Sequence, residues 1–73
     1  MGKTYVEIIG QNVRRRRYQL KLTQVELCEA AFVSRATLQR IEDGSGNPEM
    51  ETIEVLARTL GLTVPELFKE EAA

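Results

Sequence analysis

Apolar side chains recur along this chain at the three- and four-residue spacing that places them on one side of an α-helix. No segment alternates apolar and polar residues over the length of a strand. The two longest periodic segments lie at about residues 6–20 and 49–60, with apolar positions at Val6, Ile9, Val13 and Leu20, and at Met50, Ile53, Leu56, Ala57 and Leu60. A short segment follows at about residues 64–69, where Pro65 occupies an acceptable first-turn position. We predict one helix over each of these three segments.

Two helix-start signals lie between these segments, eleven residues apart. Thr23 is typical of an N-cap, and Glu26, three residues later, is its expected partner in a capping box. Ser34 is a second N-cap, and Gly44 can adopt the left-handed conformation in which many helices end. These signals predict two short helices on either side of residues 32–33. Two brief helices so close together pack at an angle, which is the helix-turn-helix arrangement.

The pattern as a whole predicts an all-α fold, a compact bundle of five helices. The chain has 73 residues, which is enough for one small domain and too few for two. We therefore expect residues 1–73 to form a single domain, with the helix-turn-helix at about residues 23–43. Its two helices are expected at about residues 24–31 and 35–43.

The predicted helix at residues 35–43 has two chemically different sides. At about 100° per residue, Leu38 and Ile41 share the side that anchors the helix. The opposite side carries Arg35, Ala36, Gln39, Arg40 and Asp43. In a helix-turn-helix such a polar row enters the major groove, where arginine can bond guanine, glutamine can bond adenine, and alanine can contact a thymine methyl. Each arginine alone would be ordinary on a protein surface, but on a helix at this position the row predicts contacts to DNA bases.

Gln24 is the first residue of the predicted helix at residues 24–31. From there its amide can bond a phosphate, which would position the protein without reading sequence. The alternative is a polar first-turn residue with no binding role.

Charge is divided unequally between the two halves of the chain. The formal net charge of −1 is unusual for a DNA-binding protein, but residues 1–40 carry +5 and residues 41–73 carry −6. The helix-turn-helix lies mainly in the basic half. Because the field near one face matters more than the total charge, the composition is compatible with DNA binding.

Catalytic, metal-dependent and membrane functions find no support in the sequence. The chain has no histidine and a single cysteine, Cys28, which excludes an internal disulfide and a Cys/His metal site. It has no arrangement of an activated nucleophile and no glycine-rich phosphate loop. No segment resembles a signal peptide or reaches the roughly 20 apolar residues that span a bilayer. We expect a cytoplasmic protein that is not an enzyme and binds no cofactor, metal, membrane or small-molecule ligand.

A set of short motifs runs through residues 9–68: Leu22-Thr23-Gln24, Glu26-Leu27, Val33-Ser34-Arg35, Thr37-Leu38, Ile41-Glu42, Gly44, Asn47-Pro48, Leu56-Ala57, Leu60-Gly61-Leu62 and Glu66-Leu67-Phe68. In combination they resemble the Cro/phage-repressor-type helix-turn-helix family, also called the Xre family. The resemblance implies a lambda-repressor-like bundle that binds operator DNA, usually as a homodimer on an inverted repeat. Within the family the chain looks like stand-alone restriction–modification controller proteins and small phage repressors.

The resemblance also assigns roles to individual residues. By position, base contacts fall to Arg35, Ala36, Gln39 and Arg40. Phosphate contacts fall to Gln24, Thr37 and Asn47. An ion pair is implied between Arg17 and Glu42, and the helical wheel agrees, because Glu42 lies at the margin of the buried side, where a carboxylate needs a partner.

Phe32 departs from the family pattern, which commonly has glycine at this position of the turn. Either the turn avoids a left-handed conformation, or Phe32 adopts it under strain. The ring is available to cover the core or a partner surface.

The acidic half offers candidates for a dimer interface, because it is expected to face away from DNA. The candidate residues are Val55, Leu62, Val64 and Phe68; the alternative is that Val55 and Val64 are scattered surface apolar residues. A second function from another class is a protein-interaction module, or an antitoxin-like partner protein, that keeps the fold but binds DNA weakly.

Overall fold

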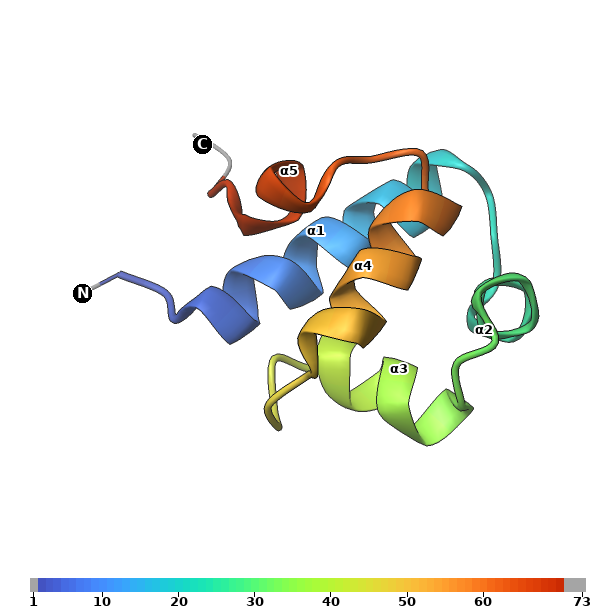
Figure 1. The fold of residues 1–73 in the computed structure, drawn as a ribbon, viewed down its shortest axis with the longest axis horizontal. Helices are drawn as coiled ribbons and strands as arrows, with labels where there is room; N and C mark the ends of the chain where they lie inside the picture. The colour runs from blue at the N-terminus through green and yellow to red at the C-terminus, as the bar shows by residue number, and fades with distance from the viewer. Residues whose placement is uncertain (1, 71–73) are drawn as a thin grey trace.

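The computed structural model describes residues 2–70, and these residues form five α-helices and no strand. The helices are α1 (Tyr5–Gln19), α2 (Gln24–Ala31), α3 (Arg35–Glu42), α4 (Met50–Thr59) and α5 (Val64–Phe68) (Figure 1). The predicted all-α, five-helix fold is confirmed. Six helix ends differ from the expected ones by one residue. α1 runs from Tyr5 to Gln19, and α4 runs from Met50 to Thr59 with Glu49 as its N-cap residue. α3 ends at Glu42 and α5 ends at Phe68.

Side-chain caps fix where most of these helices begin. Thr23 accepts from the Glu26 N–H at 3.1 Å, and the Thr23 N–H donates to the Glu26 carboxylate at 2.8 Å, which is the predicted capping box. Thr63 and Glu66 form the same pair at α5, and Thr4 caps α1. Each box satisfies backbone N–H groups that the helix itself leaves without partners.

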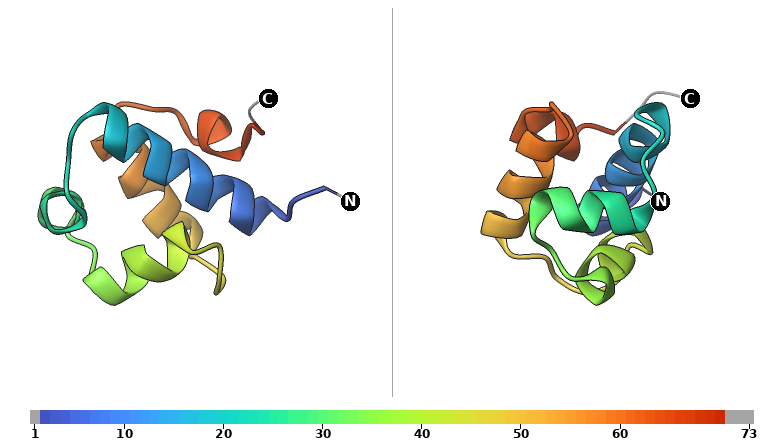
Figure 2. Two further views of the ribbon diagram at one scale, coloured as in Figure 1. Left: turned by 180° about the vertical axis from the view of Figure 1, so that it is seen from behind. Right: turned by 90° about the vertical axis from the view of Figure 1, so that its right-hand side faces the viewer.

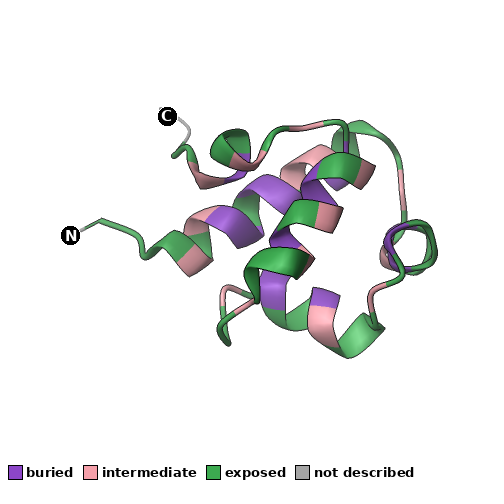
Figure 3. Cartoon of the chain, viewed as in Figure 1, coloured by how far each residue is buried: buried purple, intermediate pink, exposed green. Residues whose placement is uncertain are grey.

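The helices surround one hydrophobic core. α1 packs against α3 and α5, α2 packs against α3 and α4, and α4 packs against α5. The axes of α2 and α3 lie at an angle to each other (Figure 2). Buried positions line the inner sides of the helices in Figure 3. The buried apolar residues are Ile9, Val13, Leu27, Cys28, Ala31, Leu38, Ile41, Ile53, Leu56, Ala57, Leu60 and Leu67.

Gly10 allows α1 and α3 to approach each other closely. It is buried, and a Cβ atom built on it would overlap with the carbonyl oxygen of Ile41. A larger residue at this position would therefore push α3 away from α1. The position of α3, which the helix-turn-helix depends on, is thus fixed partly by a glycine outside the motif.

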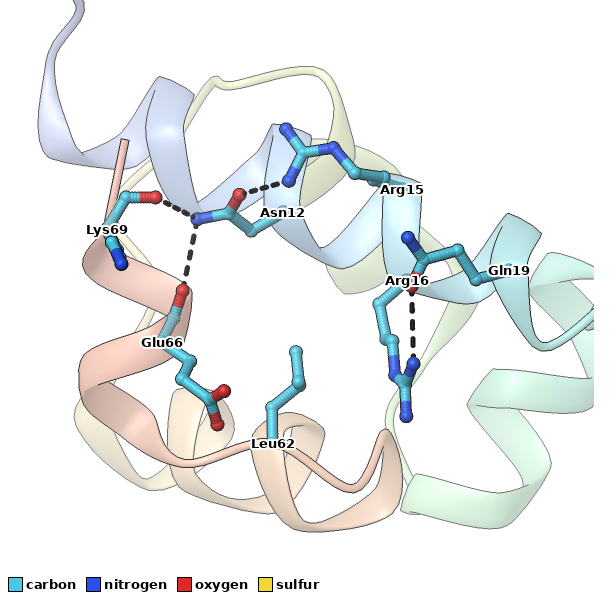
Figure 4. A pocket seen from close by; sticks show the side chains of 7 residues that line it. All are labelled: Asn12, Arg15, Arg16, Gln19, Leu62, Glu66 and Lys69. Atoms are coloured by element: carbon cyan, nitrogen blue, oxygen red, sulfur yellow. Dashed lines mark hydrogen bonds between the residues drawn. The ribbon is translucent and has the colours of Figure 1, made fainter. Parts of the chain in front are cut away.

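A buried asparagine attaches α5 to α1. Asn12 donates from Nδ2 to the carbonyl oxygen of Leu67 at 2.7 Å. It also donates to the carbonyl oxygen of Lys69 at 2.9 Å (Figure 4). Its Oδ1 accepts from Arg15 at 2.8 Å. Because α5 is only five residues long, these bonds supply partners for carbonyls that so short a helix cannot satisfy itself.

In the turn between α2 and α3, Phe32 adopts the left-handed conformation under strain, which is the second of the two alternatives expected from the sequence. Phe32 has a φ of 57° and a ψ of 45°, which is the left-handed region, and Gly44 after α3 has a φ of 74°. The Phe32 side chain is 96% exposed. The expectation that the ring could cover the core is therefore wrong, because the left-handed backbone turns the side chain outward.

Candidate nucleic-acid interface

α3 is held by its buried side and presents a polar side to solvent. Its N-cap Ser34 accepts from the Thr37 N–H at 3.1 Å, and Leu38 and Ile41 are buried. The residues predicted to contact bases are all exposed: Arg35, Ala36, Gln39 and Arg40. Asp43, also predicted on this side, is the exposed C-cap residue.

The structure brings Arg17 and Glu42 together in a buried, bidentate ion pair. Arg17 Nε donates to Glu42 Oε2 at 2.7 Å, and Arg17 Nη2 donates to Glu42 Oε1 at 2.8 Å. Arg17 Nη1 also donates to the carbonyl oxygen of Leu22 at 3.0 Å. The hydrogen bond to Glu42 raises the pKa of Arg17, so the guanidinium stays charged. The pair fastens the C-terminal end of α3 to α1.

Gln24 contacts both this ion pair and the first residue of α3. Its Nε2 donates to Glu42 Oε1 at 3.1 Å, and its Oε1 accepts from Arg35 Nη2 at 3.4 Å. The sequence did not predict either contact. The predicted phosphate contact of Gln24 remains compatible with them, because an amide nitrogen carries two N–H donors and the bond to Glu42 uses one.

Three of the predicted DNA-contacting residues line one surface cavity of about 230 Å³, namely Thr37, Arg40 and Asn47. Asn47 Oδ1 accepts from the hydroxyl of Tyr5 at 2.9 Å, which fixes the direction of the amide and leaves its N–H groups to donate elsewhere. Glu49 lines the same cavity. The cavity therefore combines one cation and four neutral side chains that can donate a hydrogen bond with one carboxylate.

The four candidates for a dimer interface are all half-buried. Leu62, Val64 and Phe68 pack against the core, and Phe68 also stacks on Tyr5 with ring centroids 6.3 Å apart. Val55 lines a cavity of about 420 Å³ beside Phe32, whereas Leu62 lines a different cavity, with Asn12 and Arg16 (Figure 4).

Cys28 is buried, and its burial raises the pKa of the thiol. The neutral thiol behaves as a small apolar side chain in the core. Residues 2–70 contain no group of three or more His, Cys, Asp or Glu side chains that could hold a metal ion. Within the same range, none of the helices has the length and apolar character to cross a membrane.

Comparison with protein families and with known proteins agrees with this geometry. Residues 8–68 match the model of a family described as "Helix-turn-helix domain". Over 63 residues, 86% of the chain, the sequence is 41% identical to the immunity repressor protein of Bacillus phage phi105. The chain spans less than half the length of the curated relatives it matches, 44% of this repressor and 24% of the transcriptional activator BcrR of Enterococcus faecalis.

Solved structures share the fold. The restriction–modification controller protein C.AhdI from Aeromonas hydrophila superimposes with a TM-score of 0.79 at 27% identity, over 85% of this chain and 94% of that one. The clp gene regulator ClgR from Corynebacterium glutamicum superimposes with a TM-score of 0.81 at 28% identity, over 88% of this chain and 68% of that one.

Proposed function

The chain belongs to the helix-turn-helix domain family, and from this premise we propose that it is a sequence-specific DNA-binding regulator of transcription. In this proposal α3 inserts into the major groove of an operator. The observation that carries the proposal is the row of exposed side chains along one side of α3. The opposite side of this helix, with Leu38 and Ile41, is buried in the core. The similarity to a phage immunity repressor and to a restriction–modification controller protein supports a regulator of one of these two kinds, a small phage-type repressor or a restriction–modification controller.

The base contacts are proposed for four of the exposed residues of this row, Arg35, Ala36, Gln39 and Arg40. Arg35 and Arg40 each have the paired donors that match the O6 and N7 acceptors of guanine, and Gln39 can make the corresponding pair with adenine. Ala36 has no polar group and allows close approach to a thymine methyl. Each good bidentate contact discriminates against the wrong base by about 1–3 kcal/mol.

The phosphate contacts are proposed for Gln24, Thr37 and Asn47. All three can donate a hydrogen bond and none carries a charge, so they position α3 without adding strongly to the salt dependence. The positive charge near the DNA comes from Arg35 and Arg40, which are exposed.

We propose further that the protein acts as a homodimer on an inverted repeat. Recognition helices that enter successive major grooves lie about 34 Å apart. The described part of one chain measures 35 × 23 × 18 Å, so two chains side by side can span that distance. The candidate contact residues are Val55, Leu62, Val64 and Phe68. Analytical ultracentrifugation at micromolar concentration, with and without operator DNA, tests this; a monomer in both conditions contradicts it.

The central experiment is selection of bound duplexes from a random pool by the purified protein. The expected product is one enriched half-site, repeated in inverted orientation with centres one helical turn apart, whose binding weakens steeply as salt rises. Arg35→Ala should remove the preference at one base pair. The matched control is Lys69→Ala, which also removes an exposed cation, on the C-terminal side of α5, and should leave the preference unchanged.

One observation favours a second candidate, a protein-interaction module. Glu49 lines the same cavity as Thr37 and Asn47, and it would repel a phosphate there. If no duplex binds even at low salt, the interaction module becomes the better account and the DNA-binding proposal fails.

A further inference from the structure

The first turn of α1 lies between α5 and the loop that joins α3 to α4 (Figure 1). Tyr5, the first residue of α1, contacts both of these segments. Its hydroxyl donates to Asn47 Oδ1 in the loop at 2.9 Å. Its ring stacks on the ring of Phe68 in α5, with centroids 6.3 Å apart and planes inclined by 12°. One side chain therefore joins three segments that lie far apart in the sequence.

Few other contacts hold the middle of this loop. Its beginning is fixed to α3, because the N–H groups of Gly44 and Ser45 each donate to a carbonyl oxygen of that helix at 3.0 Å. Within residues 2–70, the bond from Tyr5 is the only hydrogen bond of the Asn47 side chain. Asn47 is also exposed, so packing does not fix its direction. The orientation of its amide therefore depends on Tyr5.

Phe68 in turn restricts the ring of Tyr5. Tyr5 is 50% exposed, so the stack covers part of a ring that is otherwise accessible to solvent. Phe68 is half-buried and packs against the core, which holds its own ring in place. The centroid distance lies within the range of about 4.5–7 Å in which aromatic pairs attract each other. The stack therefore helps to keep the Tyr5 hydroxyl directed at the loop.

We propose that Tyr5 is a positioning residue that couples α5 to the loop that contacts DNA. Asn47 lines the cavity of about 230 Å³ that Thr37 and Arg40 also line. The Tyr5 hydroxyl occupies the amide oxygen of Asn47, so both N–H donors of the amide remain for a phosphate oxygen. A side chain that is held before binding loses less freedom when it binds. The inference rests on the proposed function, since it assumes that Asn47 contacts a phosphate.

This role predicts a particular pattern of effects on DNA binding. Phosphates carry no sequence information, so loss of the Tyr5 hydroxyl should weaken binding to every duplex by the same factor. The salt dependence should not change, because neither Tyr5 nor Asn47 carries a charge. Phe68 should affect DNA binding through Tyr5, although it lies on α5 and is not among the residues proposed to contact DNA.

The test is a double-mutant cycle on DNA affinity, measured with the selected operator and with a scrambled duplex. Asn47→Ala removes the amide and should lower the affinity for both duplexes about two- to tenfold per protomer, the worth of one hydrogen bond. Tyr5→Phe keeps the stacking ring and removes only the hydroxyl, and it should lower both affinities about two- to fivefold per protomer. In the Asn47→Ala background, Tyr5→Phe should cause no further loss.

Phe68→Leu tests the part of the coupling that comes from α5. Leucine keeps an apolar side chain at this position and removes the ring that stacks on Tyr5. The variant should lower the affinity for both duplexes, and this loss should also disappear in the Asn47→Ala background. If Phe68→Leu does not fold, the cycle between Tyr5 and Asn47 still decides the positioning role. A loss from Phe68→Leu that is independent of Asn47 overturns the coupling to α5.

Tyr18→Phe is the matched control, because it makes the same change at the only other tyrosine of the chain, near the opposite end of α1. It should show no coupling to Asn47→Ala. Equal losses from Tyr5→Phe with and without Asn47 overturn the positioning role and leave DNA binding standing. Unchanged affinity of either Asn47→Ala or Tyr5→Phe has the same meaning. If the wild type binds neither duplex, the proposed function fails, and this inference fails with it.

Discussion

Glu42→Gln tests whether the buried ion pair holds α3 in place. The Glu42 side chain is fully buried and accepts three hydrogen bonds, two from Arg17 and one from Gln24. Replacing one carboxylate oxygen by NH2 places a donor opposite a donor in either orientation of the new amide. The variant also leaves the positive charge of Arg17, whose side chain is only 7% exposed, without its counter-ion.

The expected loss of stability is about 3 kcal/mol. Removing one partner of a buried ion pair costs about 3–5 kcal/mol. The lower end applies here, because Arg17 keeps its bond to the Leu22 carbonyl at 3.0 Å and can still donate to the oxygen of the new amide. For a domain of this size, a loss of about 3 kcal/mol lowers Tm by about 12–24 °C.

Urea and thermal unfolding, followed by far-ultraviolet circular dichroism near neutral pH, measure this loss. The matched control is Glu49→Gln, the same change at an exposed N-cap residue whose side chain makes no capping bond. It should alter stability by less than about 0.5 kcal/mol. Arg17→Met combined with Glu42→Leu removes both charges and should cost less than Glu42→Gln alone. A loss below about 1 kcal/mol for Glu42→Gln would refute the reasoning.

Two further predictions concern the turn and the caps. Phe32→Gly should raise the free energy of unfolding by up to about 1 kcal/mol, because relief of about 1–2 kcal/mol of left-handed strain exceeds the entropic cost of glycine; a lower Tm would contradict it. At α5, the bonds from the Thr63 backbone and hydroxyl hold the pKa of Glu66 below its ordinary value of 4.5. A lowered folded-state pKa adds stability above the unfolded-state value, and that stability is lost as the pH falls through the folded-state value. The wild type should therefore lose more stability than Glu66→Gln between about pH 5 and pH 3 in urea titrations, and parallel curves for the two proteins would contradict this.

Features that depend on neighbouring residues could be predicted from the sequence. The caps Thr23 and Ser34 act on N–H groups within three residues, so the beginnings of α2 and α3 follow from local chemistry. The capping box of Thr4 and Glu7 is an equally local signal, and it would have placed the start of α1 correctly. The Arg17–Glu42 pair joins distant segments, and it was implied by the family resemblance. The helical pattern agreed, because it placed the Glu42 carboxylate at the edge of the apolar side of its helix.

Features that depend on residues distant in the sequence could not be predicted in this way. In the sequence, Asn12 cannot be told apart from any other polar residue of a helix. Its partner, the carbonyl oxygen of Leu67 in α5, lies 55 positions further along the chain. The two contacts of Gln24 likewise require α1, α2 and α3 to be packed first. Gly10 did offer a signal, because a glycine inside an otherwise periodic helix often marks a close approach. What it approaches, the backbone of Ile41, is set by the packing of the whole bundle.

Phe32 is where local preference and packing disagree, and packing prevails. A bulky residue disfavours the left-handed conformation by about 1–2 kcal/mol, so preference alone predicts a turn that avoids it. The residues on either side require it: Ala31 is buried, Val33 packs against the core, and the Val33 N–H donates to the Cys28 carbonyl at 3.1 Å. A right-handed residue at position 32 would continue α2 and carry Val33 away from the core. The angle at which α3 presents Arg35 is therefore set by the buried neighbours of the turn, and the strain remains at a side chain that solvent surrounds.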